Sequence, residues 1–164
     1  MPVRLRGSQM DSTDIKILTM LQKNGREAHS NIAKAVGLSA PSVSEGIKKL
    51  CSERILHRYT AILNDKKVGK ELTVFLNVYI SNPRYEEAFT KEVTMLDDIL
   101  ECHHVTGDYS YLLKVKTQNT TTLENIITQK IRAIPGVART LTNVVLSSLK
   151  EETYLNIDEQ TKNR

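Results

Sequence analysis

The sequence predicts an α+β protein made of an N-terminal winged helix-turn-helix and a C-terminal ferredoxin-like βαββαβ domain. Three observations predict this fold. Residues 31–50 hold two short helical patterns around a glycine-containing turn. From Leu72 onward, the apolar pattern gives the order strand, helix, strand, strand, helix, strand. Basic residues are concentrated at the start, with 13 Lys and Arg against 6 Asp and Glu in residues 1–70, and 10 against 13 in residues 71–164.

The composition is that of a globular protein outside the membrane. The chain has 164 residues, of which 40% are hydrophobic and 26% charged, and this suits one medium domain or two small ones. No apolar run approaches the roughly 18 to 20 residues of a membrane-spanning helix, and the N-terminus lacks the apolar core of a signal peptide. We therefore expect a cytoplasmic protein. Cys51 and Cys102 lack any C-x-x-C spacing, which predicts two buried thiols and no metal site.

The first segments form an arm and a supporting helix. Residues 1–10 form a short basic arm, expected to be a disordered DNA-touching tail or a remnant of a cloning tag. Asp11 or Ser12 can cap a helix that ends near Lys23. Its apolar residues recur at helical spacing, so this helix should pack behind the two that follow.

The two helices of residues 31–50 carry clear start and stop signals. Ser30 is placed to cap the first helix, and Gly37 supplies the positive φ that ends it. Leu38 is expected to fill the turn as a buried apolar residue. Ser39 then caps the second helix, with Pro41 in the first turn, where its missing N–H costs nothing.

The second helix has one apolar stripe, formed by Val43, Ile47 and Leu50, so its remaining positions should face outward. In a helix-turn-helix, the second helix lies in the major groove of DNA with its N-terminal residues at the base edges. Serines there can reach bases, whereas lysines further along suit phosphates, which position a protein without reading sequence. The candidate DNA-contacting residues of this helix are Ser39, Ala40, Pro41, Ser42, Ser44, Glu45, Lys48 and Lys49.

The same pattern also fits a plain helical bundle with a solvated polar face. The uneven charge of the chain favours DNA binding, because a basic part joined to a mildly acidic part is typical of a DNA-binding head on a separate body.

A β-wing and a hinge are expected next. Ile55–Leu56 and Tyr59–Leu63 are β-prone and predict a two-stranded wing, which would complete a head of residues 11–63. Arg54 and Arg58 could touch the phosphate backbone from the wing, or could be ordinary solvated arginines. Residues 64–71 are polar and basic, and predict a hinge.

The second domain, residues 72–150, is expected to be a four-stranded sheet with both helices on one face. A T-x-x-E pattern at Thr121 predicts a capping box for its second helix, and Pro135–Gly136 ends that helix. Residues 151–164 are expected to be a mobile polar tail. The expected strands are 72–80, 99–106, 109–116 and 137–149, and the first helix begins at Asn82–Pro83.

The sheet should have one face that is too apolar to be left in water. In the first strand, alternate residues from Leu72 to Ile80 face the helices, while Phe75 and Tyr79 lie on the other face. Pairing of this face with a second copy would bury it. A two-fold dimer would then present two recognition helices to a pseudo-palindromic stretch of double-stranded DNA.

The chain from Asp11 to Lys150 resembles the Lrp/AsnC (feast/famine) transcription regulators, in five stretches that keep the family's order and spacing. The resemblance implies a winged helix-turn-helix followed by an αβ-sandwich of the RAM type, homodimers that assemble into octamers, and an amino-acid effector without a cofactor. The stretches are DSTDIKILTMLQKNGR, LSAPSVSEGIKKL, RYTAILN, VTGDYSYLLKV and PGVARTLTNVVLSSLK.

The resemblance also implies where the effector binds, namely between subunits, beside the central hairpin and the last strand. A glycine lets the zwitterionic end of an amino acid approach closely, and carboxylate and hydroxyl groups can take its ammonium. The alternative is that Gly107–Asp108 is only a hairpin turn. The residues that match the family's site are Thr106, Gly107, Asp108, Tyr109, Ser110, Thr140 and Thr142.

Three positions depart from the family pattern. Ser110 stands where a second Asp is usual, which removes a carboxylate from the expected ligand site. Gly46 stands where an Arg is usual and should weaken the recognition helix. Arg54 occupies the usual place of a Gly after that helix and restores a positive charge.

The sequence offers two alternatives to an effector-controlled regulator. An effector-independent architectural protein of the same fold would wrap DNA with little sequence choice, and Gly46 and Ser110 favour that alternative. An enzyme is not expected, because the chain has no phosphate loop, nucleophile elbow or metal-ligand spacing. The general-base candidates are His29, His57, His103 and His104; the first two fall in the DNA head, and the adjacent pair should point to opposite faces of a strand.

Overall fold

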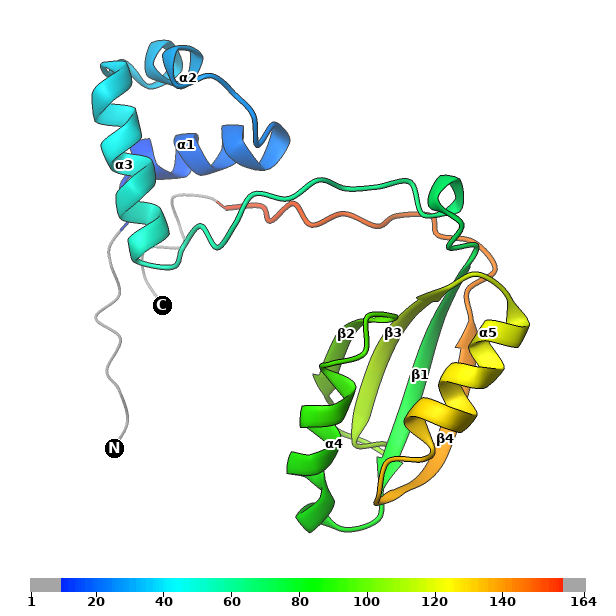
Figure 1. The fold of residues 1–164 in the computed structure, drawn as a ribbon. Helices are drawn as coiled ribbons and strands as arrows, with labels where there is room; N and C mark the ends of the chain where they lie inside the picture. Colours follow the sequence, from blue (N-terminus) through cyan, green and yellow to red (C-terminus); the bar gives the residue numbers. More distant parts are fainter. Residues whose placement is uncertain (1–9, 158–164) are drawn as a thin grey trace. The chain divides into compact units, whose positions relative to one another are not determined.

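The computed structural model describes residues 10–157, and its contacts divide the chain into two compact units (Figure 1). Of the described residues, the first unit contains 10–61 and 151–157, and the second contains Ile62–Lys150. The expected arm at residues 1–9 lies outside the described residues. Within them, no helix is long and apolar enough to cross a membrane.

The first unit, here called the head, is built on three helices: α1 (Ser12–Lys23), α2 (His29–Val36) and α3 (Ala40–Ser52). Their apolar stripes meet in one buried core, as the helical spacing predicts. The core residues are Ile17, Leu18, Leu21, Ile32, Ala33, Val43, Ile47 and Leu50.

The helix ends show which capping predictions hold. Asp11 caps α1 through a reciprocal box with Asp14, and Ser39 caps α3. Gly37 ends α2 in the left-handed conformation at φ 72°. The predicted Ser30 cap is wrong, because α2 begins at His29, two residues earlier than a Ser30 cap would require, and its N-cap Ala28 has no side-chain hydrogen bond.

Neither Leu38 nor Cys51 is buried. Leu38 is 45% exposed in the turn between α2 and α3, so it does not fill that turn. Cys51 is exposed because it follows Leu50 on α3 and therefore lies off the buried stripe, whereas Cys102 is partly buried in the second unit. Both cysteines are free thiols.

The predicted wing does not form as a pair of strands. The backbone amides of Ile55 and Leu56 both donate to the Leu50 carbonyl oxygen, at 2.9 and 3.1 Å, so they terminate α3. Beyond them, Ile62 and Leu63 are 82% and 64% exposed, and no strand lies between residues 53 and 71 of the described chain. A strand needs a neighbouring strand for its hydrogen bonds, and this segment has none.

The described part of the predicted polar tail, residues 151–157, belongs to the head. The Gln22 side chain accepts a hydrogen bond from the Leu155 amide at 2.7 Å and donates to the Leu155 carbonyl oxygen at 3.0 Å. Ile157 packs against the core of the head. The head is therefore assembled from both ends of the chain.

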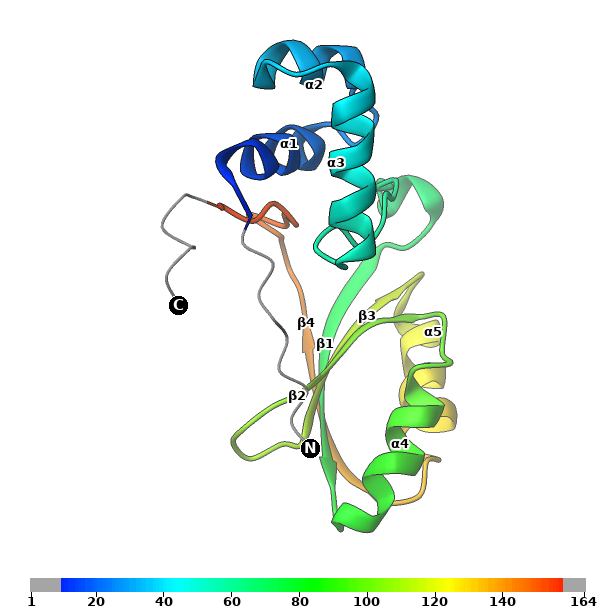
Figure 2. The ribbon, with the colours of Figure 1, turned by 90° about the vertical axis from the view of Figure 1, so that its left-hand side faces the viewer.

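The second unit is an antiparallel sheet in the order β2-β3-β1-β4, and two helices cover one of its faces (Figure 2). This is the predicted βαββαβ topology, with β3 joined directly to β2 and the outer strands reached through helices. The elements are β1 (Leu72–Ile80), α4 (Glu86–Val93), β2 (Ile99–His104), β3 (Tyr111–Thr117), α5 (Thr120–Asn125) and β4 (Val137–Val144).

The helices differ from prediction at their ends. Asn82 caps a short 3-10 turn, Pro83–Tyr85, which leads into α4. The capping box of α5 is made by Asn119 and Thr122, not by Thr121 and Glu124, because the helix begins earlier than the T-x-x-E pattern predicted. After α5 the chain continues as a π-helical segment, Ile126–Ile131.

The alternation of β1 places its residues as predicted. Val74, Leu76, Val78 and Ile80 are buried beneath the helices. On the opposite face, which no helix covers in Figure 2, Tyr79 is 39% exposed and Leu141 is 46% exposed, with Phe75 and Leu112 partly exposed. This helix-free face therefore leaves apolar side chains in contact with solvent.

Residues 64–71, the predicted hinge, have local structure of their own. They contain a 3-10 turn, Lys66–Val68, and lie within the second unit. Asp65 pairs with Lys116 of β3, and the Lys70 ammonium lies 2.8 Å from the Asp98 carboxylate. These ion pairs hold the segment against the sheet.

Candidate DNA-contacting helix and ligand pocket

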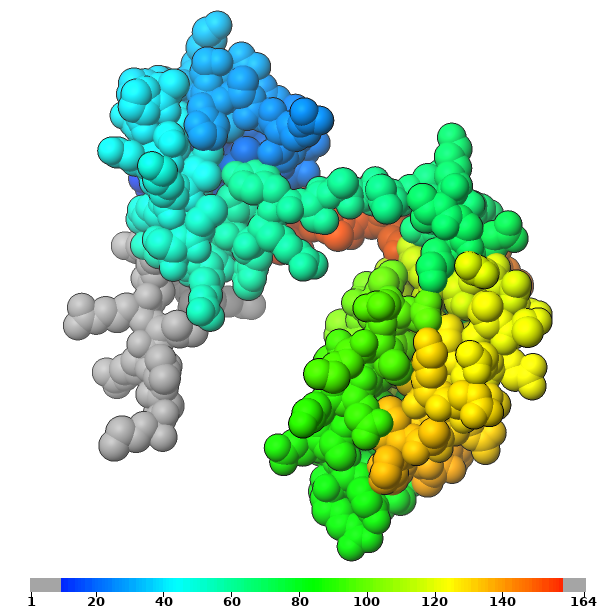
Figure 3. Space-filling view, viewed as in Figure 1, coloured from blue at the N-terminus to red at the C-terminus, as the bar shows by residue number. Residues whose placement is uncertain are grey.

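The start of α3 is a polar, exposed end of the head, and the cyan side chains of this helix stand at its surface in Figure 3. The Ser42 amide donates to the Ser39 hydroxyl oxygen at 3.2 Å, and the two hydroxyl oxygens lie 2.8 Å apart. Pro41, Ser42 and Glu45 are exposed. The serine pair thus both caps the helix and presents hydroxyl groups to solvent.

Some of the candidate residues of α3 face partly inward. Ala40 packs against the core of the head, so the prediction that it points outward is wrong, and Ser44 is partly buried. Lys48 is exposed. Lys49 is also exposed, but its ammonium lies 3.6 Å from the carboxylate of the buried Asp14 on α1. Lys48 is therefore the better placed of the two lysines to reach an external phosphate.

Arg54 follows α3 in the left-handed conformation, at φ 58°. This conformation is strained for any residue with a Cβ and readily adopted by glycine, which explains why glycine suits this position. Arg54 and Arg58 are both exposed, although not in the β-wing that the sequence predicted.

Gly46 lies where α3 passes α1. A Cβ added to Gly46 would meet only Ile17 Cδ1, at 3.6 Å, which is an ordinary van der Waals distance. The glycine is therefore not required for close packing of these helices, and its cost to helix stability is not offset by a tighter contact.

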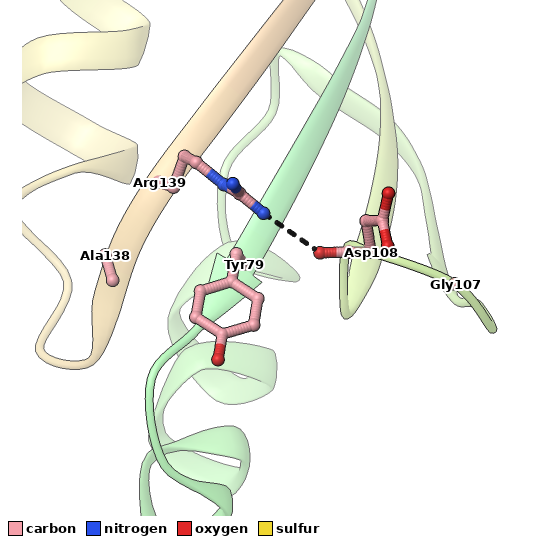
Figure 4. A pocket seen from close by; sticks show the side chains of 5 residues that line it. All are labelled: Tyr79, Gly107, Asp108, Ala138 and Arg139. Atoms are coloured by element: carbon pink, nitrogen blue, oxygen red, sulfur yellow. Dashed lines mark hydrogen bonds between the residues drawn. The ribbon is translucent and has the colours of Figure 1, made fainter.

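A second candidate site lies in the other unit, at the end of the sheet where β2 turns into β3. A pocket of about 550 Å³ is lined there by Tyr79, Gly107, Asp108, Ala138 and Arg139 (Figure 4). Gly107 has φ 113°, which only glycine adopts without strain, so the turn keeps its backbone open to an approaching ligand.

Arg139 organises this pocket. Its guanidinium donates to the Asp108 carbonyl oxygen at 3.3 Å, as Figure 4 shows, and lies 4.9 Å from the ring of Tyr109 and 5.5 Å from that of Tyr79. The Asp108 carboxylate is exposed at the same turn. The pocket thus offers a cation and an anion together, which is the complement of a zwitterion.

The expected effector residues separate into two groups. Thr140 and Thr142 do not line the pocket, because they pair with Val78 and Leu76 and so share the helix-covered face of the sheet. Arg139 pairs with Tyr79 on the opposite face. Sequence reasoning missed Arg139, although the alternation of β4 around Leu141 was a signal that could have identified it.

Ser110 and Thr106 stand outside the pocket lining. The Ser110 hydroxyl oxygen accepts a hydrogen bond from the Ile80 amide at 3.2 Å, while its own amide donates to the Val78 carbonyl oxygen. Ser110 therefore fastens the start of β3 to β1. Thr106 is exposed next to the Gly107 turn, and Tyr109 reaches the site through its contact with Arg139.

The two adjacent histidines of β2 lie on opposite faces of the sheet. His103 lies 3.2 Å from Glu101 on the helix-free face, whereas His104 stacks on Tyr111 at 4.9 Å on the helix-covered face, as the strand alternation predicts. Among the described residues there is no cluster of His, Cys, Asp and Glu that could hold a metal ion.

A three-helix head with an exposed, capped helix, followed by a domain that carries a ligand pocket, defines a DNA-binding transcriptional regulator of the helix-turn-helix class. Two known domains match the chain: the AsnC-type helix-turn-helix domain over residues 10–50 and the Lrp/AsnC ligand binding domain over residues 73–155. The chain belongs to the Lrp/AsnC family of transcriptional regulators, and its relatives are not enzymes.

Curated relatives and solved structures agree with this assignment. The leucine-responsive regulatory protein of Haemophilus influenzae is 32% identical over 152 residues, which covers 92% of both chains. That of Escherichia coli K12 is 33% identical over 153 residues, covering 92% of this chain and 93% of its own. A transcriptional regulator of Neisseria meningitidis, solved as a complex with L-methionine, superimposes with a TM-score of 0.87 at 28% identity, covering 92% of this chain and 99% of that one.

Replacing Gly46 with alanine should stabilise the head. The added methyl group has room beside Ile17, and alanine favours the helix over glycine by about 1 kcal/mol. Hydrogen exchange of the α1 and α3 amides should therefore show a free energy of opening that is higher by about this amount.

Gly37→Ala is the matched control for this substitution. Gly37 has φ 72°, so the same added methyl group should lower the stability of the head. If both alanine variants destabilised the head equally, the spacing between α1 and α3 described here would be wrong.

Proposed function

We propose that this regulator reads DNA through the N-terminal half of α3 and responds to an amino acid bound beside Gly107 and Arg139. It acts in the cytoplasm, as a homodimer that assembles further toward an octamer, on pseudo-palindromic sites. The observation that carries the proposal is the pairing of two surfaces on one chain: an exposed capped helix in a basic head, and a pocket that presents opposite charges.

The proposed DNA surface contains residues that would contact base edges and residues that would contact phosphates. Ser42 and its neighbours at the start of α3 would meet base edges, as the first residues of a recognition helix do. Lys48, Arg54 and Arg58 would contact phosphates. Lys49 contributes less, because Asp14 already neutralises part of its charge.

The effector proposal rests on the chemistry of the pocket. Arg139 can hold an α-carboxylate and Asp108 an α-ammonium, with Gly107 leaving backbone room between them. The Neisseria meningitidis relative was solved with L-methionine, so L-methionine is the first probe to use.

Assembly is supported by the helix-free face of the sheet. Tyr79 and Leu141 are 39% and 46% exposed there, and a second copy packed on this face would remove them from water. The same pairing would present two α3 helices to one stretch of DNA.

The DNA proposal predicts that Lys48→Met weakens binding to operator and random DNA alike. Loss of one phosphate contact should lower the slope of log affinity against log salt by about 0.9, while preference between sequences is retained. Titrations of a labelled duplex at several salt concentrations measure both quantities.

Lys16→Met is the control for the DNA titrations, because Lys16 is an exposed lysine on α1 of the same head. Its salt slope should equal that of the unsubstituted protein. Equal slopes for all three proteins would contradict the assignment of α3 as the DNA-contacting helix.

The effector proposal predicts that an amino acid raises the melting temperature by mass action, and that Arg139→Met makes this rise smaller at the same ligand concentration. The affinity should fall at least about tenfold, since hydrogen bonds to charged groups contribute about 1.5 to 3 kcal/mol. A thermal-shift screen of the twenty amino acids, beginning with L-methionine, measures this.

Arg84→Met is the matched control, because the Arg84 guanidinium also lies over a tyrosine ring, 4.6 Å from that of Tyr85, but outside the pocket lining. It should leave the response intact. A flat screen, or an unchanged response in Arg139→Met, would overturn the effector proposal and favour the effector-independent architectural role.

A further inference from the structure

A second pocket lies in the ligand-binding domain, at the end of the sheet opposite the Gly107 turn. The register shows the separation, because β1 pairs Leu72 with Thr117 at one end and Val78 with Tyr111 at the other. Six strand residues span about 20 Å, so the two pockets are distinct. The second pocket measures about 240 Å³ and is lined by Lys70, Asp98, Thr117, Gln118, Thr122, Asn125, Ile126 and Lys130.

The charges of this pocket do not balance. One carboxylate, Asp98, is shared by two ammonium groups, with Lys70 at 2.8 Å and Lys130 at 3.2 Å. The hydrogen bond from Lys70 is the main reason why the pKa of Asp98 lies below its ordinary value, so Asp98 is ionised at neutral pH. Asp98 is the only acid among the described residues that line the pocket, which leaves an excess of one positive charge.

Hydrogen-bond donors remain available around these charges. Each ammonium has three N–H groups and gives one of them to Asp98 in the described structure. The side-chain amides of Gln118 and Asn125 are exposed at the pocket and make no hydrogen bond within the described part of the chain. The Thr122 hydroxyl is fixed there, since it accepts from the buried Thr117 at 2.7 Å.

The π-helical segment is what brings Lys130 into this pocket. In a regular α-helix, the residue four positions after Ile126 lies over it and would face the core. Here the wider turn buries Ile126 and Ile131, five positions apart, and leaves Lys130 beside Asp98. Single π-helical turns inside helices are frequent at functional sites.

We propose that this pocket binds a small oxyanion, as inorganic phosphate or as the phosphate or carboxylate group of a small metabolite. The excess positive charge attracts the anion, and the spare N–H groups of the lysines and side-chain amides coordinate its oxygens. The volume lies below the roughly 300 to 1,000 Å³ of drug-sized ligand sites, so only a small group fits. The proposal does not depend on the effector site at the other end of the sheet.

Calorimetric titration of the full chain with inorganic phosphate, at constant ionic strength in chloride, tests the proposal. We expect saturable binding that Lys130→Met weakens at least about tenfold. Lys130→Arg should keep most of the affinity, because it keeps the charge. Lys91→Met, at an exposed lysine of α4, is the matched control and should bind as the unsubstituted protein does.

The basic head could also bind phosphate, and Lys48→Met separates the two sources. Phosphate binding that is lost in Lys48→Met and retained in Lys130→Met would overturn the proposal, and so would binding that chloride abolishes or that none of the substitutions changes. Circular dichroism establishes that Lys130→Met is folded.

Acetate, titrated in the same way, identifies the bound group. Competition between acetate and phosphate would assign a carboxylate-accepting site, and phosphate binding without competition would assign a phosphate site. L-Methionine affinity, measured with and without saturating phosphate, distinguishes the two sites. An effector at Gly107 should bind equally well under both conditions.

Discussion

The arrangement of the ligand-binding domain depends on one constraint, which is that its two helices cover only one face of a four-stranded sheet. The core beneath them is complete, with Val74, Leu76, Val78 and Phe89 fully buried. The other face keeps Phe75, Tyr79 and Leu141 in partial contact with water. Burial of apolar surface is the dominant favourable term in association, so this face supplies a driving force for pairing with a second copy.

The two candidate ligand sites differ in how close they lie to the helix-free face of the sheet. Both pockets lie at strand ends, where polar side chains can gather without disturbing the hydrogen-bond ladder. Arg139 and Tyr79 belong to the helix-free face, so the first pocket adjoins the surface proposed for pairing. A ligand beside Arg139 would then bias assembly, which is how binding at one site changes affinity at another. The second pocket lies beside α5 and is separated from that surface.

The head is held together by contacts from both ends of the chain. Its three helices share one core, and the segment around Leu155 returns to α1, where Gln22 makes two hydrogen bonds with its backbone. The ligand-binding domain is therefore inserted between two segments of the head. The chain that leaves β4 therefore ends in a segment that is hydrogen-bonded to α1.

The sequence predicted the elements that depend on periodicity and capping. Ser39, Gly37 and the Val43 stripe define α3 locally, and the alternation of β1 defines its two faces, so neither required knowledge of distant contacts.

Features that depend on distant partners could not be predicted in this way. The prediction of a β-wing was wrong because Ile62 and Leu63 have β-propensity but no neighbouring strand in the described chain. Gln22 and Leu155, and Arg139 and Asp108, meet only through the fold. The π-helical turn that places Lys130 has no signal in the spacing of its isoleucines.

Sedimentation equilibrium of the full chain tests whether the helix-free face pairs with a second copy, with Leu141→Glu compared against Met95→Glu. Leu141 lies on the helix-free face, whereas Met95 is 75% exposed just beyond α4. We expect a dimer or a larger assembly for the unsubstituted protein and for Met95→Glu, and dissociation toward monomer for Leu141→Glu. A folded monomer at micromolar concentration, or an assembly unaffected by Leu141→Glu, would contradict this pairing.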